Sequence, residues 1–342
     1  MEILKRRIPL NIMMLKKNIF LIILFFSPTI LIAENKLVIY TYESFSSEFG
    51  AGMPIKEIFE KKYDCKIEFI ALADANVILT RLSLEQASSR ADLIIGLDNL
   101  LLKKAENLEL FSEHKLKLNL TNYNLKSAFN SKYFIPFDYG YLAFVYSKKK
   151  YPNLSPNFKQ FIQNLSPDTL IAYQDPRTSS PGLSFVNWLA KSYPDDFDML
   201  IKSLDQASLN YPASWSQAYQ MFLNEDIDFV LSYITSPLYH LIVENDDSYG
   251  FYQPYEGNPL QVEYAGITKN SKNFYLAQKF LQFLISEEAQ SILPETQWMF
   301  PIAKVNLRAE FKKLQNSLPQ KVKIDYLTDY NPLLIQWQKS LN

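Results

Sequence analysis

The chain is poor in the residues that build disulfides, metal centres and nucleotide loops. Its 342 residues include a single cysteine, Cys65, two histidines, His114 and His240, and 8 glycines. One cysteine cannot close an intrachain disulfide, so the fold has to rest on its hydrophobic core. No GxGxxG or Walker pattern occurs, which argues against a glycine-rich nucleotide loop. The histidines have no cysteine partner and no HExxH spacing, so no metal site is expected.

A strong charge of one sign is also lacking. The formal net charge is −1, and no long basic run occurs outside the N-terminus. Nucleic-acid binding is therefore disfavoured, because it depends on clustered Lys and Arg. Hydrophobic residues are plentiful at 48%, and aromatic residues make up 15% of the chain. This composition is sufficient for a sizeable core and favours two domains or one large one.

The N-terminus has the pattern of an export signal. Lys16 and Lys17 precede an apolar run over 19–26, and a second apolar stretch ends at Ala33. A basic flank, a short apolar region and a small residue before a polar segment are typical of a secretory signal peptide. The competing interpretation is a transmembrane anchor, but the run is short for a membrane span and Pro28 interrupts it.

We therefore predict that residues 1–33 are a signal peptide, cleaved after Ala33. Leu31 is larger than the residue usual at that point of a cleavage site, and a start at Met14 would give a signal of more usual proportions. Cleavage would remove five basic residues and one glutamate and leave a net charge of −5. No cysteine lies at the cleavage point, so a soluble periplasmic protein is expected and a lipoprotein is not.

Beyond Ala33 the hydrophobic pattern alternates between strand and helix. This β-α-β alternation predicts an α/β protein with a mainly parallel sheet and helices on its faces. The expected strands are 37–40, 66–70, 92–96, 134–147, 170–173, 229–231 and 262–265. The expected helices are 55–63, 75–86, 183–192, 215–223, 237–243, 274–285 and 332–339.

The long strand-like region 134–147, interrupted by Pro136 and Gly140, suggests a crossing between two domains, and a second crossing is expected near 262–267. The predicted layout is a discontinuous lobe 1, formed by 34–137 and 266–342, and a continuous lobe 2, formed by 138–265. Such a layout is that of a two-lobed clamp.

Strings rich in aromatic, hydroxyl and carboxylate groups lie at the ends of these elements. They are Tyr40–Phe45, Phe137–Tyr141, Tyr173–Gly182, Ser232–Pro237 and Trp298–Met299, and the strings Gly96–Asn99, Leu260–Glu263 and Leu276–Phe283 accompany them along the chain. In this order, they resemble the periplasmic thiamine-binding proteins of bacterial ABC transporters, which are type II periplasmic binding proteins. The resemblance covers nearly all of the chain beyond Ala33.

The resemblance implies a two-lobed type II fold, in which each lobe is a mixed, mainly parallel sheet flanked by helices and the ligand lies between the lobes. It implies capture of thiamine, and of thiamine monophosphate and diphosphate, followed by docking on a membrane permease that works with an ATPase. On this interpretation the protein is a monomer, is not an enzyme and needs no cofactor.

A cationic thiazolium needs aromatic faces and a nearby carboxylate. The resemblance places Trp215, Tyr233, Tyr239 and Trp298 at binding positions, with Tyr42 as a further candidate. Without it, each of these aromatic residues would more often be assigned to the core. Phe49 stands where a tryptophan is expected in relatives.

Asp74 is the predicted acidic contact, and Ala75 follows it where the family pattern has glycine. A purely structural role for Asp74 is to cap the helix that begins at Ala75. Asp138, in the predicted crossing, is expected to be a structural hydrogen-bond anchor.

Two predicted helix N-termini add hydroxyl groups and free N–H groups. Ser180 is expected to cap a helix that begins at Pro181, where the free N–H groups favour a phosphate or hydroxyl. From the residues alone, a simple helix cap is the first choice. The resemblance makes Ser179 and Ser180 predicted ligand contacts, together with Ile234, Thr235 and Ser236 before a second such helix. Arg177 is assigned either to a phosphate or to an ion pair with Asp175.

Two alternatives remain open from the sequence. The first is a ferric-ion-binding protein of the same fold, since the chain has 22 tyrosines that could cluster around iron. The second is a secreted thiamine-degrading transferase, which would require an activated nucleophile such as a cysteine. Cys65 lies away from all predicted contacts, so the binding protein is favoured over the enzyme.

Overall fold

The structure is a computed structural model that describes residues 35–319 and 323–341. The predicted signal peptide, residues 1–33, lies outside the described residues. Within the described ranges, no helix has both the length and the apolar character needed to cross a membrane.

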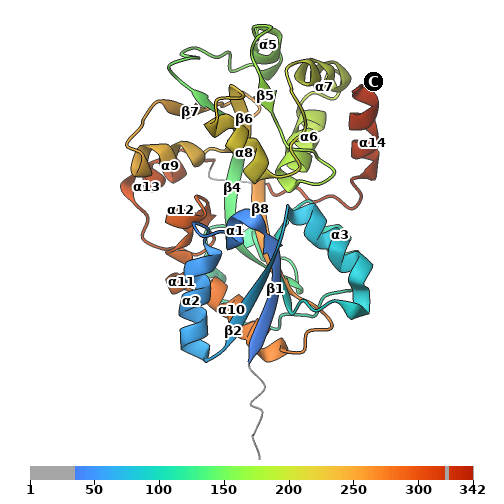
Figure 1. Ribbon diagram of the computed structural model, residues 1–342, viewed down its shortest axis with the longest axis vertical. Helices are drawn as coiled ribbons and strands as arrows, with labels where there is room; N and C mark the ends of the chain where they lie inside the picture. Colours follow the sequence, from blue (N-terminus) through green and yellow to red (C-terminus); the bar gives the residue numbers. More distant parts are fainter. Residues whose placement is uncertain (1–34, 320–322, 342) are drawn as a thin grey trace, which may run out of the picture. The chain divides into compact units, whose positions relative to one another are not determined.

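One mixed sheet runs through the described part of the chain in the order β2-β1-β3-β8-β4-β6-β5, with β7 and β9 also paired to β4 (Figure 1). The strands are β1 Lys36–Tyr42, β2 Lys66–Leu72, β3 Leu93–Asp98, β4 Phe134–Ser147, β5 Ile171–Ala172, β6 Phe229–Tyr233, β7 Tyr249–Phe251, β8 Leu260–Ile267 and β9 Phe300–Pro301.

The expectation of a mainly parallel sheet holds only away from the centre. β1 pairs in parallel with β2 and β3, and β5 pairs in parallel with β6. The ladders that join β3 to β8, and β4 to β6, β7, β8 and β9, are antiparallel. The long strands β4 and β8 run against their neighbours because each carries the chain from one part of the sheet to the other. The result is a mixed sheet with antiparallel central strands.

Two principal hydrophobic cores lie along this sheet. The first gathers side chains of β1, β2, β3 and β8, among them Leu37, Ile39, Ile95 and Val262. The second gathers Leu142 and Phe144 of β4 with side chains of β5 and β6. Successive residues of a strand point to opposite faces, so Phe229 and Leu231 enter the second core while Val230 enters a smaller third cluster. Two cores joined by β4 and β8 produce two lobes.

Helices cover both cores. In Figure 1, α2 and α10 lie on one side of β1 and β2, and α3 lies on the other. The helices formed by residues before β4 and after β8 are α1 Glu43–Ser46, α2 Gly52–Tyr63, α3 Ala75–Glu85, α4 Leu102–Asn107, α10 Phe274–Leu284, α11 Glu287–Gln290, α12 Leu293–Thr296, α13 Ala309–Asn316 and α14 Asn331–Ser340. The helices between β4 and β8 are α5 Phe158–Gln163, α6 Ser180–Ser192, α7 Phe197–Gln206, α8 Trp215–Leu223 and α9 Ser236–Val243.

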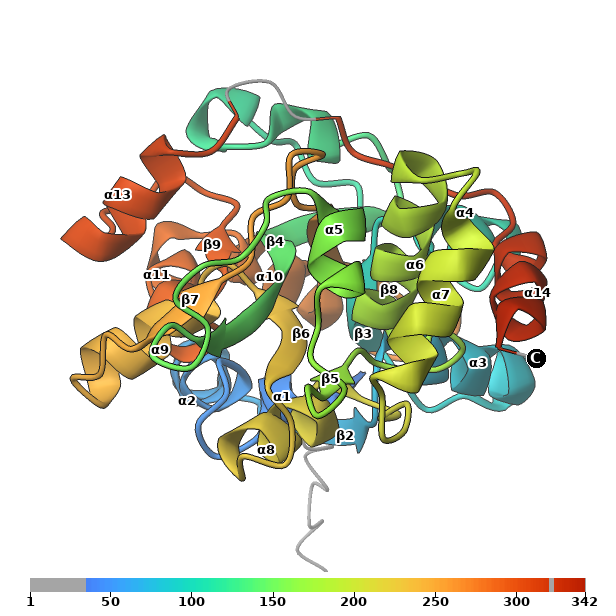
Figure 2. The same ribbon diagram turned by 90° about the horizontal axis from the view of Figure 1, so that it is seen from above.

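The last helix returns to the second core. Figure 2 shows α14 beside α6 and α7, and the contacts between these helices agree. Trp337 of α14 is buried, and its Nε1 donates a hydrogen bond to the Tyr173 hydroxyl at 3.0 Å. The predicted lobe boundaries placed 266–342 with lobe 1, so this helix packs on residues assigned to lobe 2. The boundaries themselves stay a prediction.

The predicted elements are present, with shifted ends and several additions. The expected strand 170–173 is only the two residues of β5, and the expected helix 183–192 begins at Ser180. The prediction that Ser180 caps a helix starting at Pro181 is wrong. The helix includes Ser180, its N-cap is Ser179, and the Ser179 side chain makes no capping hydrogen bond. The short helices α1, α4, α5, α11 and α12 were not expected, because four to six residues carry too little periodicity to detect.

Candidate functional site

A cavity of about 450 Å³ lies where the ends of several strands and helices meet. Its lining comes from the β1–α1 segment, the N-terminal ends of α3, α6 and α9, helix α8, strand β8 and the residues after α12. The lining includes most of the predicted contacts, namely Tyr42, Asp74, Ser180, Trp215, Tyr233, Ser236, Tyr239 and Trp298. Segments far apart in the sequence therefore converge on one space.

Four predicted contacts lie behind this lining. Ala75, Ser179, Ile234 and Thr235 are buried and do not line the cavity. Thr235 has a structural partner, because its hydroxyl donates a hydrogen bond to the carbonyl oxygen of Trp298 at 2.5 Å. Phe49, which replaces an expected tryptophan, lines the cavity with 84% of its surface exposed. Ligand contact at all these positions stays a prediction.

Asp74 joins two helix N-termini. Its Oδ1 accepts hydrogen bonds from the backbone N–H of Ala75 at 2.7 Å, at the start of α3, and of Ser180 at 3.1 Å, at the start of α6. Burial raises the pKa of Asp74 to about 6, and the two N–H donors work against this shift. The capping role proposed for Asp74 is thus present, and the same carboxyl group lines the cavity.

One wall of the cavity is a pair of stacked rings on α8. The rings of Trp215 and Tyr219 lie 4.9 Å apart at an angle of 21°. Trp215 Nε1 donates to Ser232 Oγ at 2.9 Å, which fixes the indole edge against β6. The Tyr219 hydroxyl lies 2.9 Å from Nε2 of the buried His240. Both rings are therefore held by hydrogen bonds on the side away from the cavity.

His240 has a defined orientation. Its Nδ1 lies 2.7 Å from a carboxylate oxygen of Glu244, and its ring stacks on Tyr249. A carboxylate can only accept, so Nδ1 carries a proton and donates it to Glu244, while Nε2 faces the Tyr219 hydroxyl. Neither Tyr219 nor His240 was predicted to belong to the site. The sequence signal was present as Trp215, Tyr219 and Phe222, whose spacing places them on one face of a helix.

Trp298 also lines the cavity and has an unusual backbone conformation. Its φ is +55°, and its ring meets the Tyr239 ring edge to face at a centroid distance of 5.3 Å. A positive φ at a bulky residue requires surrounding contacts that hold it. Two hydrogen bonds hold this conformation. The Thr235 hydroxyl donates to the Trp298 carbonyl, and the Trp298 N–H donates to the Leu293 carbonyl. The Trp298 ring is thereby held at the cavity surface.

The cavity floor is a polar network that sequence reasoning did not assign. The Tyr42 hydroxyl donates to Glu263 Oε2 at 2.5 Å, and Gln261 Nε2 lies 2.9 Å from the Tyr233 hydroxyl and 3.3 Å from Glu263 Oε1. Gly96, with φ of +102°, lies under the Tyr42 ring, where a Cβ atom would come within 2.2 Å of it. The signal for Gln261 and Glu263 was two polar residues alternating with apolar ones in an otherwise buried strand.

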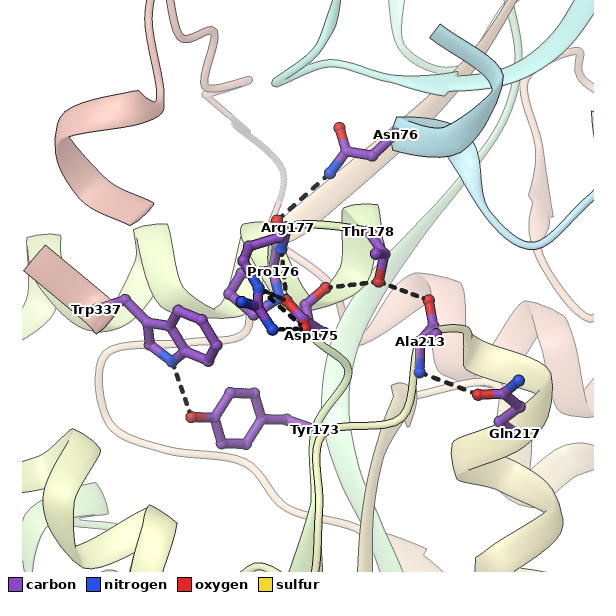
Figure 3. Close-up of polar contacts among 9 residues, drawn as sticks. All are labelled: Asn76, Tyr173, Asp175, Pro176, Arg177, Thr178, Ala213, Gln217 and Trp337. Atoms are coloured by element: carbon purple, nitrogen blue, oxygen red, sulfur yellow. Dashed lines mark hydrogen bonds and ion pairs between the residues drawn. The ribbon is translucent and has the colours of Figure 1, made fainter. Parts of the chain in front are cut away.

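Behind the site, contacts from three directions hold the turn formed by residues 175–178 (Figure 3). Arg177 forms an ion pair with Asp175, and its guanidinium lies 5.4 Å from the centre of the Trp337 ring. Asn76 donates to the Pro176 carbonyl at 3.4 Å, and the Thr178 hydroxyl donates to the Ala213 carbonyl at 2.8 Å. Of the two roles left open for Arg177, the structure contains the pair with Asp175, and Arg177 does not line the cavity.

The residues named for the two alternative functions are placed differently. Four tyrosines, Tyr42, Tyr219, Tyr233 and Tyr239, line the cavity. Cys65 is buried between α2 and β2 and does not line the cavity, and burial raises the pKa of its thiol. In the described residues, no group of three or more His, Cys, Asp or Glu side chains is arranged to hold a metal ion.

Comparison with known proteins agrees with this arrangement. The family described as bacterial extracellular solute-binding protein matches residues 42–291. The thiamine-binding periplasmic protein of Escherichia coli K12 is 40% identical over 301 residues, which covers 88% of this chain and 90% of the relative. A solved structure of a periplasmic thiamin binding protein superimposes with a TM-score of 0.83 at 36% identity, covering 90% of this chain and 97% of that one.

A more distant neighbour has only the fold in common with this chain. The ferric binding protein from Campylobacter jejuni has a TM-score of 0.65 at 21% identity and covers 89% of this chain and 97% of that one. The fold is accordingly the two-lobed type II periplasmic binding protein fold. Because the family match spans most of the chain and the identity to the Escherichia coli relative extends over nearly all of it, the chain belongs to the bacterial extracellular solute-binding proteins and, among them, to the family of the periplasmic thiamine-binding proteins.

Proposed function

We propose that this protein captures thiamine in the described cavity, in the periplasm, and delivers it to the membrane permease of an ABC transporter that works with an ATPase. The observation that carries the proposal is the combination, in one cavity, of the rings of Trp215, Tyr239 and Trp298 with the carboxyl groups of Asp74 and Glu263. The names of the similar proteins support the same ligand.

The cavity matches the chemistry of thiamine. The ligand has a cationic thiazolium, an aminopyrimidine and a hydroxyethyl arm. Aromatic faces attract an organic cation, and a buried cation needs a carboxylate partner. A volume of about 450 Å³ lies within the range of pockets that enclose small organic ligands.

The proposal extends to thiamine monophosphate and thiamine diphosphate. The N-terminal ends of α6 and α9 both reach the cavity, through Ser180 and Ser236, and the start of a helix favours an anion. In this structure, however, Asp74 accepts the Ser180 N–H. A phosphate placed there would have to coexist with this carboxyl group or displace it. Comparing the affinities of the three ligands therefore tests the polar end of the cavity.

The proposal also covers export, oligomeric state and transport. Residues 1–33 act as the export signal, and the processed protein is a soluble monomer that releases its ligand unchanged and needs no cofactor. Closure of two lobes around the ligand changes the surface that the permease meets, so transport favours the loaded state.

The test is calorimetric titration of the exported protein, unfolded and refolded to remove any retained ligand, with thiamine and its two phosphates. Binding of one thiamine per chain is expected. Ser180→Ala should weaken the phosphorylated ligands more than thiamine, whereas Ser184→Ala, in the same helix and outside the cavity lining, should leave all three unchanged. Equal weakening of all three ligands by Ser180→Ala would refute a phosphate contact at α6.

Two other outcomes would redirect the proposal. Absence of heat with every thiamine compound, together with a coloured protein that contains iron, would favour the ferric-ion-binding alternative. Loss of thiamine over time, detected by chromatography of the incubated mixture, would favour the thiamine-degrading transferase.

A further inference from the structure

Two acidic side chains face each other across the central strands. Asp138 of β4 and Glu263 of β8 are directly opposite in an antiparallel ladder, which puts both side chains on the same face of the sheet. Asp138 is fully buried and Glu263 is 6% exposed. The prediction that the Asp138 side chain is a structural hydrogen-bond anchor is wrong, because within the described residues neither of its carboxyl oxygens has a hydrogen-bond partner. Two adjacent buried carboxylates cannot both be ionised without a large loss of stability.

No cation of the described part of the chain compensates this pair, since the ion pairs found there involve neither Asp138 nor Glu263. The ionisable groups that face the pair from neighbouring elements are all acids or phenols: Tyr42 of β1, Asp74 at the start of α3, Asp98 of β3 and Tyr233 of β6. Burial first, and then repulsion between carboxylates, raises the pKa of both Asp138 and Glu263. The opposing effect comes from the Tyr42 and Gln261 hydrogen bonds to Glu263.

The pair is connected to the cavity through Glu263. Glu263 lines the cavity together with Gln261, which is only 1% exposed. The amide oxygen of Gln261 has no hydrogen-bond partner within the described residues, so it is available to a donor group of a ligand. A positive charge bound at this floor would be the nearest compensating charge for the pair.

We propose that Asp138 and Glu263 together hold one proton while the cavity is empty, and that they release it to solvent when a cationic heterocycle binds. The pair then becomes the counter-ion of the ligand, and Glu263 is the member that meets it. This inference rests on the proposed function, with thiamine as the cation. Asp138 is a positioning residue, because it acts through Glu263.

The consequence is a pH-dependent affinity. Below the pH at which the empty pair loses its proton, the ligand must displace that proton, so the affinity falls about tenfold for each unit of decreasing pH. Above that pH the affinity no longer depends on this proton. The thiazolium keeps its charge, but the aminopyrimidine of thiamine and the Asp74 carboxyl group also titrate in acid. The pH dependence assigned to the pair is therefore the part that Glu263→Gln and Asp138→Asn remove. The protein would therefore bind its ligand most weakly in acid.

The first part of the experiment needs no ligand. The exported protein, refolded without ligand, is examined by infrared difference spectroscopy between acidic and alkaline solution. Buried carboxylic acids are expected to give neutral C=O signals at neutral pH, and one of these signals should be missing in both Glu263→Gln and Asp138→Asn. Asp98→Asn identifies the separate signal of Asp98, a buried acid with a raised pKa outside the cavity lining, and this signal should remain in both pair variants. If neither pair variant removed a signal that the wild type shows, the shared proton would be overturned.

The second part adds thiamine. Calorimetry in two buffers of different protonation enthalpy measures the protons released, and about one per ligand is expected for the wild type and for Asp98→Asn. Glu263→Gln and Asp138→Asn should release much less, and their affinities should change less between pH 5 and 7. Undiminished release from both variants would overturn the coupling while leaving thiamine binding intact. If thiamine did not bind at all, the proposed function would fail, and the shared proton would still be decided by the infrared signal.

Discussion

Removing the Trp215 ring should weaken thiamine binding without unfolding the protein. The indole lines the cavity, stacks on Tyr219 and is fixed through Nε1 to Ser232. A cation over such a face in a desolvated site contributes about 2 kcal/mol. Trp215→Ala should therefore raise the Kd for thiamine about 30-fold, since 1.4 kcal/mol corresponds to a factor of ten.

Two further variants separate the aromatic face from the hydrogen bond. Trp215→Phe keeps an aromatic face but loses the bond to Ser232, so it should lower the stability by about 1 kcal/mol and keep most of the affinity. Trp188→Ala removes a tryptophan of α6 that does not line the cavity, and its Kd should match that of the wild type. Calorimetry gives the affinities, and circular dichroism on the same samples establishes that each variant is folded.

The reasoning fails if folded Trp215→Ala binds thiamine within about twofold of the wild type. That result would mean that the cation does not lie over α8. Trp298 would then be the ring to test, because it also lines the cavity and its backbone is held by hydrogen bonds.

Three more predictions concern stability. His240→Leu leaves the buried Tyr219 hydroxyl without its partner and should cost about 1–3 kcal/mol in denaturant unfolding, and adding Tyr219→Phe should recover part of that loss. Burial raises the pKa of Asp98 to about 7, so the native state keeps a proton that the unfolded chain loses near pH 4. The free energy of unfolding should therefore fall by up to about 4 kcal/mol as pH rises from 4 to 8, and Asp98→Asn should flatten this slope. Trp337→Phe and Tyr173→Phe should each cost about 1 kcal/mol, and a double-mutant cycle should show that the two losses do not add.

The sequence predicted the parts of the site that carry a local signal. Asp74 stands before a helical pattern, which marks an N-cap, and Trp215 begins another helix. The resemblance supplied the choice among the aromatic residues. Ala75 and Ser179 illustrate the limit of this reasoning, because a string adjacent to a site does not reveal which of its residues face the cavity.

The unpredicted part depends on contacts between distant segments. Glu263 and Asp138 are 125 positions apart in the chain, and only the register of β4 and β8 makes them neighbours. The expected parallel sheet would not have paired them. The position of α14 has the same origin, since no local pattern around Trp337 indicates that it packs against Tyr173. Pairing between strands and the return of a terminal helix are set by the packing of the whole core.

Two hydrogen bonds beside the cavity connect the start of α3 in lobe 1 to the segment that leads into α6 in lobe 2. Asp74 accepts the Ser180 N–H, and Asn76 donates to the Pro176 carbonyl. Each such bond contributes about 1 kcal/mol net, because water replaces it when it opens. A ligand can shift such an equilibrium only by as much as its affinity differs between the two arrangements. On the proposed function, a cation that contacts Trp215 of lobe 2 and Trp298 of lobe 1 gains both contacts only when the lobes are closed, so its binding shifts the population towards the closed arrangement.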